Sequence, residues 1–376
     1  MRIGLLGAGR IGAFHAGTLA AHPDVAELLV ADADPARSER VAAGHGGRAL
    51  TVDALFAARP DAVVVATATS THADLLARAA RGGIPAFCEK PLARDLPGTL
   101  AAVRAAERDG AVLQVGFQRR FDPEYAAARE AVRAGKVGRL HTVRTVSSDA
   151  VPPPAAYVPL SGGLYRDCLI HDFDALRWVT GREVAEVYAA GANVGADFFR
   201  AASDVDTGAV LLTLEGGVLA TATAARYHAA GYDVRMELAG TEGQLAVGTG
   251  PRAPLSPAVP PPAAGTASAA DAGAGRGGGT AAGGGVRPAV PPPWPGFLDR
   301  FAAAYVAELA AFLRVARGEA DNPCTPRDAL RALLVAEACE RSRAGRRPVA
   351  LAELDEVTGE LGAGAARATE RATPWA

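Results

Sequence analysis

Three glycines near the start of the chain constrain its fold more than any other feature of the sequence. The segment RIGLLGAGRIGAFHAGTLAA passes from an apolar stretch through a glycine turn into a helix-like run, and Gly7, Gly9 and Gly12 follow the pattern G-x-G-x-x-G. The first glycine permits a tight turn, the second lets the backbone approach a pyrophosphate, and the third lets the helix pack closely on the strand. The pattern therefore predicts a dinucleotide-binding unit with its phosphates at the helix N-terminus, beside Arg10 and Ile11.

An acidic residue follows at the expected distance. The next apolar stretch, AELLVADADPAR, ends near Asp32, 20 residues after Gly12. An acid at this spacing binds the adenosine ribose hydroxyls and repels a 2′-phosphate, which favours NAD over NADP. Arg37 is close enough in sequence to soften that preference, and Asp32 also suits a role as a turn aspartate or helix cap.

The rest of the first third alternates between short apolar runs and helix-like runs: DAVVVAT, THADLLARAARGG, IPAFCEKP, DLPGTLAAVRAAERDG and AVLQVGFQ. Such alternation predicts a doubly wound α/β domain with a parallel sheet. Ligands bind beyond the carboxyl ends of such strands. Four candidate cofactor residues fall there, namely Thr67, His72, Glu89 and Lys90.

Composition excludes several classes of protein. The 376 residues suffice for two domains, and a net charge of −2 gives no basic surface for nucleic acid. No apolar run approaches the ~18 residues of a membrane span, and no leader precedes the glycine motif, so we expect a cytoplasmic protein. Four scattered cysteines match neither a zinc spacing nor a disulfide framework.

Lysine is unusually scarce. Only Lys90 and Lys136 are lysines among the 39 basic residues. A lysine ammonium is compact and responds to its surroundings, whereas a guanidinium stays protonated. Lys90, in the segment FCEKPLA, is therefore a candidate for chemistry, and Lys136, in the turn-like RAGKVGR, is interpreted as a surface residue.

A second chemical signal lies in GGLYRDCLIHDFDALRW. Asp167, His171 and Asp174 are four and three residues apart, so on a regular helix they share one face. Two carboxylates and an imidazole on one face fit a metal site, an acid–base site or a solvated surface. No second cluster of ligands is evident, so no metal is expected.

Five segments together resemble the glucose–fructose oxidoreductase/inositol dehydrogenase (Gfo/Idh/MocA) family: GAGRIGAFHAGTL, ATATSTHADLL, FCEKPLA, VGFQRRFDPEY and SGGLYRDCLIHDFDALRW. The resemblance covers roughly residues 1–351. It implies a Rossmann domain over 1–119 and an α+β substrate domain over 120–345 with a large, open, mostly antiparallel sheet. The helix over 326–345 is then expected to return to the first domain, with 346–376 as a tail. The open sheet implies a homodimer or homotetramer.

The resemblance also implies residue roles. Oxidation of a secondary alcohol needs a proton acceptor with a pKa near working pH, which suits His171 as general base. Asp167 is expected to orient that imidazole, and Lys90 to stabilise the developing alkoxide. Substrate contacts are expected from Arg120, Asp174 and Tyr232. For Arg120 an ion pair with Asp122 or Glu124 is the alternative, and for Tyr232 packing in the sheet.

The sequence departs from the family pattern in two segments. One bears on the identity of the substrate, and the other is expected to be disordered. In the loop SSDAVPPP, Ser148 and Ala150 stand where many inositol dehydrogenases carry an arginine or histidine followed by Asp/Asn-Pro. This departure weakens the case for myo-inositol as the substrate and admits an inositol derivative, an aminocyclitol precursor or a sugar. Residues 250–296 are rich in Pro, Gly and Ala, and we expect a disordered insertion there.

Three classes of function remain in competition. An NAD-dependent dehydrogenase of a cyclic polyol is favoured. An NAD-dependent glycoside hydrolase of the same family would use the cofactor without net reduction. A nucleotide sensor without turnover is disfavoured because the Lys–Asp–His set is complete.

Overall fold

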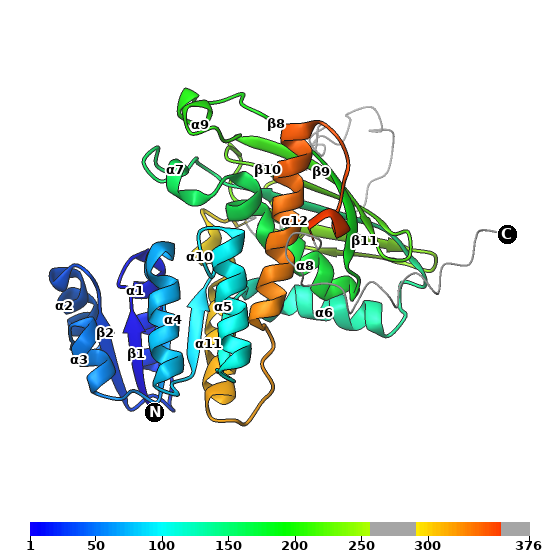
Figure 1. Cartoon of the computed structure of the whole chain (residues 1–376). Helices are drawn as coiled ribbons and strands as arrows, with labels where there is room; N and C mark the ends of the chain where they lie inside the picture. The colour runs from blue at the N-terminus through cyan, green and yellow to red at the C-terminus, as the bar shows by residue number, and fades with distance from the viewer. Residues whose placement is uncertain (256–290, 355–376) are drawn as a thin grey trace, which may run out of the picture.

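The computed structural model describes residues 1–255 and 291–354, which build two parts around two sheets (Figure 1). The first sheet has the order β3-β2-β1-β4-β5-β6, and all its neighbouring strands are parallel. This is the doubly wound order, with the switch point between β1 and β4. The strands are β1 (Arg2–Leu6), β2 (Glu27–Ala31), β3 (Arg48–Ala49), β4 (Ala62–Val65), β5 (Ala86–Glu89) and β6 (Leu113–Gly116).

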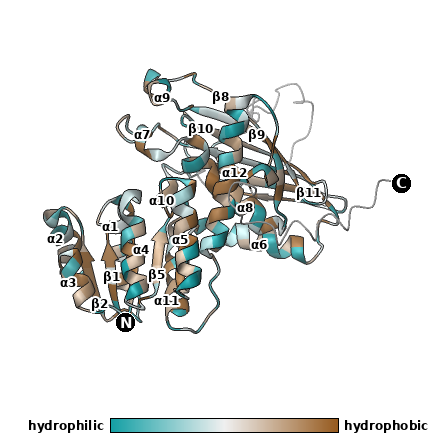
Figure 2. Cartoon of the chain, viewed as in Figure 1, coloured by the Kyte–Doolittle hydropathy of each residue, from teal (hydrophilic) through white to brown (hydrophobic). Residues whose placement is uncertain are grey.

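These strands are apolar on both faces because helices cover both faces. On one face, α3 (Val52–Ala57), α4 (His72–Arg81) and α5 (Leu96–Arg108) pack on alternate strand residues. On the other face lie α1 (Arg10–Ala21), α2 (Pro35–Gly44) and α11 (Ala302–Ala316). Figure 2 shows the hydrophobic strands enclosed by helices that carry hydrophilic residues. The predicted α/β class of the first part is confirmed.

The second sheet has the order β12-β11-β7-β10-β9-β8-β13. Its neighbours are antiparallel except β7 and β10, which run parallel. The mostly antiparallel second sheet is therefore as predicted. Its strands are β7 (Leu140–Ser148), β8 (Val184–Ala192), β9 (Thr207–Leu214), β10 (Leu219–Ala225), β11 (Asp233–Gly240), β12 (Gln244–Val247) and β13 (Val349–Ala350).

Helices cover one face of the second sheet. A π-helical turn (Tyr165–Leu169) leads into α8 (Ile170–Thr180), and α6 (Pro123–Arg133) packs against α8. The long helix α12 (Pro326–Gly345) begins at a capping box made by Thr325 and Asp328. It contacts α5 and β6 of the first part as well as α8 and β8 of the second, and it lies between the two parts in Figure 1.

The predicted disordered insertion and the predicted tail fall largely outside the described residues, which omit 256–290 and 355–376. The described flanks of the insertion are held in place. The main-chain N–H of Tyr232 donates to the carbonyl of Trp294 at 2.9 Å, and Arg252 lies over the Trp294 ring at 4.3 Å. The start of the predicted tail also pairs with the second sheet, since β13 runs antiparallel to β8. Within the described residues, no helix combines the length and apolar character needed to cross a bilayer.

Candidate active site

The glycine loop is built for close contact with its surroundings. Gly7 has φ of +99°, which favours glycine, and a Cβ there would lie 2.5 Å from the carbonyl carbon of Ala66 beyond β4. A Cβ on Gly12 would overlap the carbonyl oxygen of Gly7. Both glycines are therefore required by the fold of the loop itself.

Gly9 differs from these two glycines. Its backbone φ of −73° suits any residue, and a Cβ built on it meets no atom of the described protein within 4 Å. Gly9 is the N-cap of α1, no side chain caps that helix end, and its first turn holds no acidic residue. Free main-chain N–H groups facing open space beside Gly9 suit the anionic pyrophosphate of a dinucleotide. Arg10 is exposed at the same point and lies 4.7 Å over the Phe297 ring.

Asp32 holds the neighbouring turn. Its carboxylate accepts the main-chain N–H of Ala8 at 2.7 Å and that of Asp34 at 2.9 Å, and Arg37 lies 3.5 Å away. The turn role considered from the sequence is therefore present. The carboxylate remains partly accessible at the carboxyl end of β2, where the ribose of a dinucleotide would lie.

His72 has a different role from the one predicted. Its side chain is 1% exposed, and its ring nitrogens lie 2.9 Å from the carbonyl of Pro91 and 3.1 Å from that of Thr67. Burial lowers the pKa of His72 against the effect of those carbonyls. His72 thus joins the loops after β4 and β5 from a buried position. Thr67 is partly exposed, and its hydroxyl accepts from Thr71 at 2.7 Å.

Glu89 and Lys90, at the end of β5, contact different parts of the protein. Glu89 bonds to the buried His15 of α1 at 2.7 Å, which ties β5 to the helix of the glycine loop. Lys90, the next residue, reaches across to the second part. Its ammonium donates to the main-chain carbonyl of Asp167 at 2.8 Å and lies 3.2 Å from the Asp167 carboxylate. Two residues that are 77 positions apart in sequence therefore meet between the two sheets.

Asp167 is the most heavily bonded group at this junction. Besides Lys90, it accepts the hydroxyl of Tyr157 at 3.0 Å and Arg226 at 2.8 Å. Burial alone would raise the pKa of Asp167, but the charges of Lys90 and Arg226 and these hydrogen bonds hold that pKa well below its usual range. The carboxylate is thus permanently ionised at neutral pH.

His171 lies near this junction and is neutral. Burial, followed by the charges of Lys90 and Arg119, lowers the pKa of His171 well below its ordinary value, against the opposite effect of Asp167. No hydrogen bond joins Asp167 and His171 within the described residues, and the Nδ1 atom of His171 is buried there without a partner. The predicted orienting contact is therefore replaced by the contact of Asp167 with Lys90.

Asp174 lies three residues after His171 in α8. The π-helical turn at Tyr165–Leu169 precedes both residues, so it interrupts the 3.6-residue period only between Asp167 and His171. The Asp174 carboxylate is fully buried and accepts Nε of Arg120 at 2.9 Å and Nη2 at 2.6 Å. Arg120 also donates to the carbonyl of Pro323 and lies 3.1 Å from Asp328.

The substrate roles of Arg120 and Asp174 stay predictions. In this structure the two side chains pair with each other inside the protein. The partners considered from the sequence for Arg120 are also engaged elsewhere, since Asp122 pairs with Arg300 at 2.7 Å. Within residues 1–255 and 291–354, no group of three or more His, Cys, Asp or Glu side chains is arranged to hold a metal ion.

Tyr232 lies close to the same junction. Burial raises the pKa of its hydroxyl, and the nearby charged groups include Arg119, Asp149 and Asp172. Arg119 is itself buried and held by two contacts. Its Nη1 lies 2.8 Å from Asp172, and its Nη2 donates to Ser147 at 2.9 Å. These buried pairs fix α8 against β7.

Sequence reasoning missed Tyr157, Arg226 and Asp149, which surround Asp167. Arg226 directly follows β10, and Asp149 directly follows β7, so both stand where parallel strands end. No local motif marks them. The parallel pairing of β7 and β10, which the sequence does not reveal, is the signal that would have found them.

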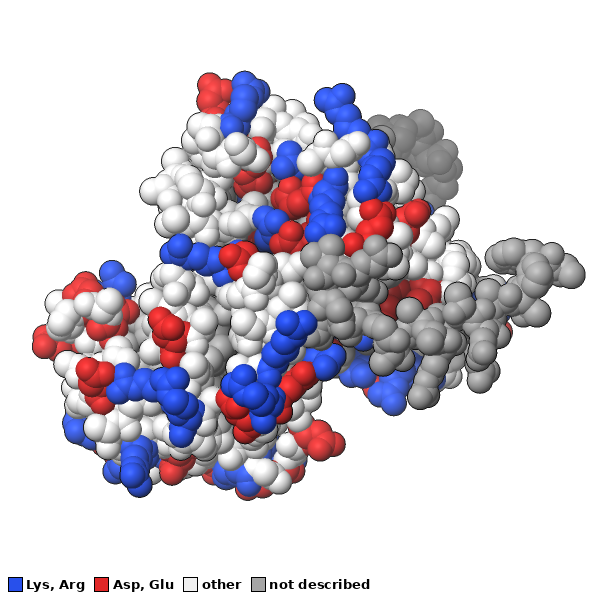
Figure 3. All heavy atoms as spheres, in the orientation of Figure 1, with Lys and Arg blue, Asp and Glu red and all other residues white. Residues whose placement is uncertain are grey.

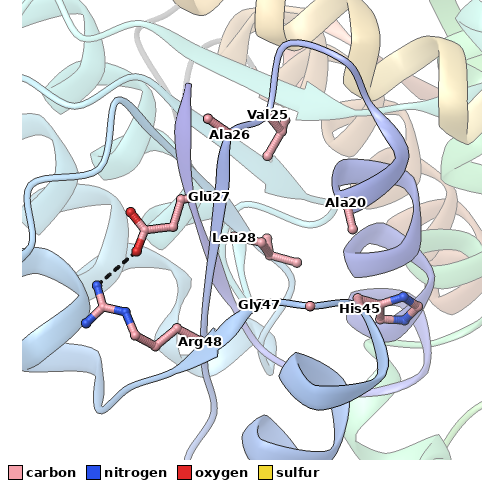
Figure 4. Close-up of a pocket in the computed structure, with 9 residues that line it drawn as sticks. Ala20, Val25, Ala26, Glu27, Leu28, His45, Gly47 and Arg48 are labelled. Atoms are coloured by element: carbon pink, nitrogen blue, oxygen red, sulfur yellow. Dashed lines mark hydrogen bonds and ion pairs between the residues drawn. The ribbon is translucent and has the colours of Figure 1, made fainter.

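A surface depression elsewhere lacks these features. It lies at the amino-terminal end of β2, away from the carboxyl ends of the strands, and contains the Glu27–Arg48 ion pair at 3.1 Å (Figure 4). Its lining residues include Ala20, Val25, Ala26, Leu28, His45 and Gly47. Acidic and basic side chains are interspersed over the face of the molecule shown in Figure 3, so that face carries no extended basic patch that would attract a polyanion.

Comparisons with known proteins match both parts of the chain. Residues 1–117 match the model described as "Oxidoreductase family, NAD-binding Rossmann fold", and residues 125–246 match the "GFO/IDH/MocA C-terminal domain". The chain is 39% identical to the myo-inositol dehydrogenase Hyg17 of Streptomyces leeuwenhoekii over 93% of this chain and 100% of that protein.

Two solved structures are similar over nearly the whole chain. The myo-inositol dehydrogenase of Corynebacterium glutamicum has a TM-score of 0.79 and 34% identity, covering 93% of this chain and 98% of its own. The scyllo-inositol dehydrogenase of Lactobacillus casei, solved with NAD(H) and scyllo-inositol, has a TM-score of 0.78 and 27% identity, covering 94% and 99%.

The two glycines of the loop provide a matched test. Gly9→Ala adds a methyl group to open space, so we expect an unchanged melting temperature and NADH binding weakened about tenfold or more, because the methyl group occupies the proposed path of the pyrophosphate. Gly12→Ala forces its methyl group into the Gly7 carbonyl, so the melting temperature should fall. Thermal unfolding and NADH fluorescence titration measure both effects. Unaltered NADH affinity in Gly9→Ala would contradict the assigned position.

Proposed function

Because the chain belongs to the Gfo/Idh/MocA oxidoreductase family, we propose that it oxidises a secondary hydroxyl of a cyclic polyol, such as myo-inositol or a related cyclitol, to the ketone. The family membership makes it an NAD-dependent oxidoreductase. The observation that carries the proposal is the meeting of Lys90 and Asp167 beside His171, between the glycine loop and the second sheet.

The residues of this junction supply what alcohol oxidation needs. We assign His171 as general base, because it is neutral and can take the hydroxyl proton. Lys90 donates a hydrogen bond to the same oxygen and stabilises its developing negative charge. Asp167 holds Lys90 in place through its carboxylate and carbonyl. NAD, when bound, accepts the hydride from the carbinol carbon, so the products are ketone, NADH and one proton.

Cofactor contacts are proposed for the loop and strand ends described above. Open space beside Gly9 and the uncapped start of α1 support the pyrophosphate position, with Arg10 and Ile11 adjoining it. The partly accessible carboxylate of Asp32 supports the ribose position. Thr67 and Glu89 stand at the ends of neighbouring strands, and Tyr232 remains the proposed substrate contact from the second sheet.

We also propose that the outer face of the second sheet joins two copies of the chain. Tyr188 and Leu211 are register partners on β8 and β9 and are 44% and 49% exposed, and Leu219 on β10 is 48% exposed. Large apolar side chains gathered on an open sheet favour a partner surface. Sedimentation velocity should show a dimer or tetramer for the wild type and smaller species for Leu211→Glu. A wild type that sediments as a monomer would contradict this proposal.

A substrate panel tests the function. Myo-inositol, scyllo-inositol, an aminocyclitol and a hexose are each mixed with enzyme and NAD, and the absorbance of NADH is followed. We expect NADH to form with a cyclitol at a higher kcat/KM than with the hexose. NADH from the hexose alone would identify a sugar dehydrogenase, and cleavage of a glycoside without net NADH would identify a hydrolase.

His171→Ala serves as the control for that panel. Loss of the base should lower kcat by about 10²–10⁴-fold, while NADH affinity stays nearly unchanged because His171 is assigned no part in cofactor binding.

In the wild type, His171 remains deprotonated below its ordinary pKa of about 6.5, so kcat/KM should stay level as the pH falls through that value. An acid limb centred at or above that pH would contradict the assignment.

A further inference from the structure

Arg226 lies where two parallel strands end at the same edge of the second sheet. Ser148 of β7 and Ala225 of β10 are the last register pair of these strands. The N–H of Asp149 donates to the carbonyl of Ala225 at 2.9 Å, and the N–H of Arg226 donates to the carbonyl of the buried Asp206 at 2.8 Å. The backbone of Arg226 is therefore fixed, and its side chain is only 4% exposed.

The guanidinium of Arg226 bridges two carboxylates. Nη1 lies 3.1 Å from Asp149, and Nη2 lies 2.8 Å from Asp167. A buried cation requires such anionic partners to offset its lost hydration. The planar fork of arginine presents its donors in a fixed geometry, which suits holding two carboxylates at set positions.

Tyr157 holds the opposite side of the same carboxylate. Its hydroxyl donates to Oδ1 of Asp167 at 3.0 Å, whereas Arg226 binds Oδ2. Lys90 lies 3.2 Å from Oδ1. With both oxygens held by neighbouring donors, the Asp167 carboxylate cannot rotate away from the Lys90 ammonium without breaking at least one hydrogen bond.

We propose that Arg226 and Tyr157 are positioning residues for the alcohol oxidation, fixing the Asp167 carboxylate so that Lys90 points at the reacting hydroxyl. This inference rests on the proposed function, in which Lys90 contacts the substrate oxygen. Arg226 and Tyr157 act through Asp167 and Lys90, and they take no part in the hydride or proton transfer.

The charges around Asp167 support this role. Lys90 and Arg226 are the cations that face Asp167, Asp149 is the nearby anion, and Tyr157 and His171 complete its titratable neighbours. Burial raises the pKa of Asp149, with Arg226 opposing and Asp167 adding to that rise. Without Arg226, two neighbouring carboxylates would face Lys90 as the remaining cation, and the pKa of Asp167 would rise.

Three variants test the inference kinetically. Arg226→Met should lower kcat by about 10–100-fold through misplacement of Lys90, leave KM for NAD nearly unchanged, and move the acid limb of kcat to higher pH. Tyr157→Phe removes one donor from a 43% exposed residue and should act in the same direction, more weakly, without a fall in melting temperature. Arg177→Met is the matched control, because Arg177 is 7% exposed and bidentate with Glu183, at the far end of α8.

The control separates positioning from general stability. Arg177→Met should keep the wild-type pH profile if the inference is right, although it removes a similarly buried arginine from its ion pair. Equal effects of Arg226→Met and Arg177→Met on melting temperature, with an unmoved pH profile in both, would overturn the positioning role.

The scarcity of lysine provides a readout that needs no substrate. In protein labelled with ¹³C-lysine, only Lys90 and Lys136 contribute Cε resonances, and the exposed Lys136 serves as the internal reference. Arg226→Met and Tyr157→Phe should move the Lys90 resonance and leave that of Lys136 in place, whereas Arg177→Met should move neither. An unmoved Lys90 resonance in Arg226→Met would overturn the inference. A wild type that oxidises no polyol would instead overturn the proposed function, and the Lys90 resonance would still report on the contact.

Discussion

The contact between Lys90 and Asp167 is the interaction on which the site depends. Lys90 stands at the end of β5 in the nucleotide-binding part, and Asp167 stands in the π-helical turn of the second part. Neither part alone holds both groups. The ammonium is fixed by a main-chain carbonyl and a carboxylate, so its position depends on how the two parts pack. The long helix α12, which contacts both parts, keeps that packing in register.

Buried ion pairs next to this contact fix the position of the elements that carry it. Consecutive arginines point to separate acids of α8, Arg119 to Asp172 and Arg120 to Asp174, and all four side chains are almost fully buried. Removal of one partner from such a pair leaves an uncompensated charge, which is strongly destabilising. Their common effect is to fix α8, and with it Asp167 and His171, relative to the ends of β6 and β7.

The features that could be predicted from the sequence are those marked by a local pattern of residues. The glycine spacing and the alternation of apolar runs led to the parallel sheet, and the scarcity of lysine pointed to Lys90. The residues predicted less well depend on tertiary partners. His72 was placed at a strand end correctly, but its contacts with two carbonyls turn it inward. Asp167 was placed on the face of His171 because a regular helix was assumed, and the π-helical turn interrupts that period between the two residues, whereas Asp174 follows His171 within α8 and pairs with Arg120. Arg226 carries no motif, and only the parallel ends of β7 and β10 bring it to Asp167.

The most direct test is a crystal structure of the enzyme with NAD and a bound cyclitol. The account predicts that the Lys90 ammonium and a ring nitrogen of His171 both lie within about 3.2 Å of one hydroxyl oxygen, with the carbinol carbon of that hydroxyl against the nicotinamide. A cyclitol whose reacting hydroxyl contacts only one of these two groups, or lies in another cleft, would contradict it.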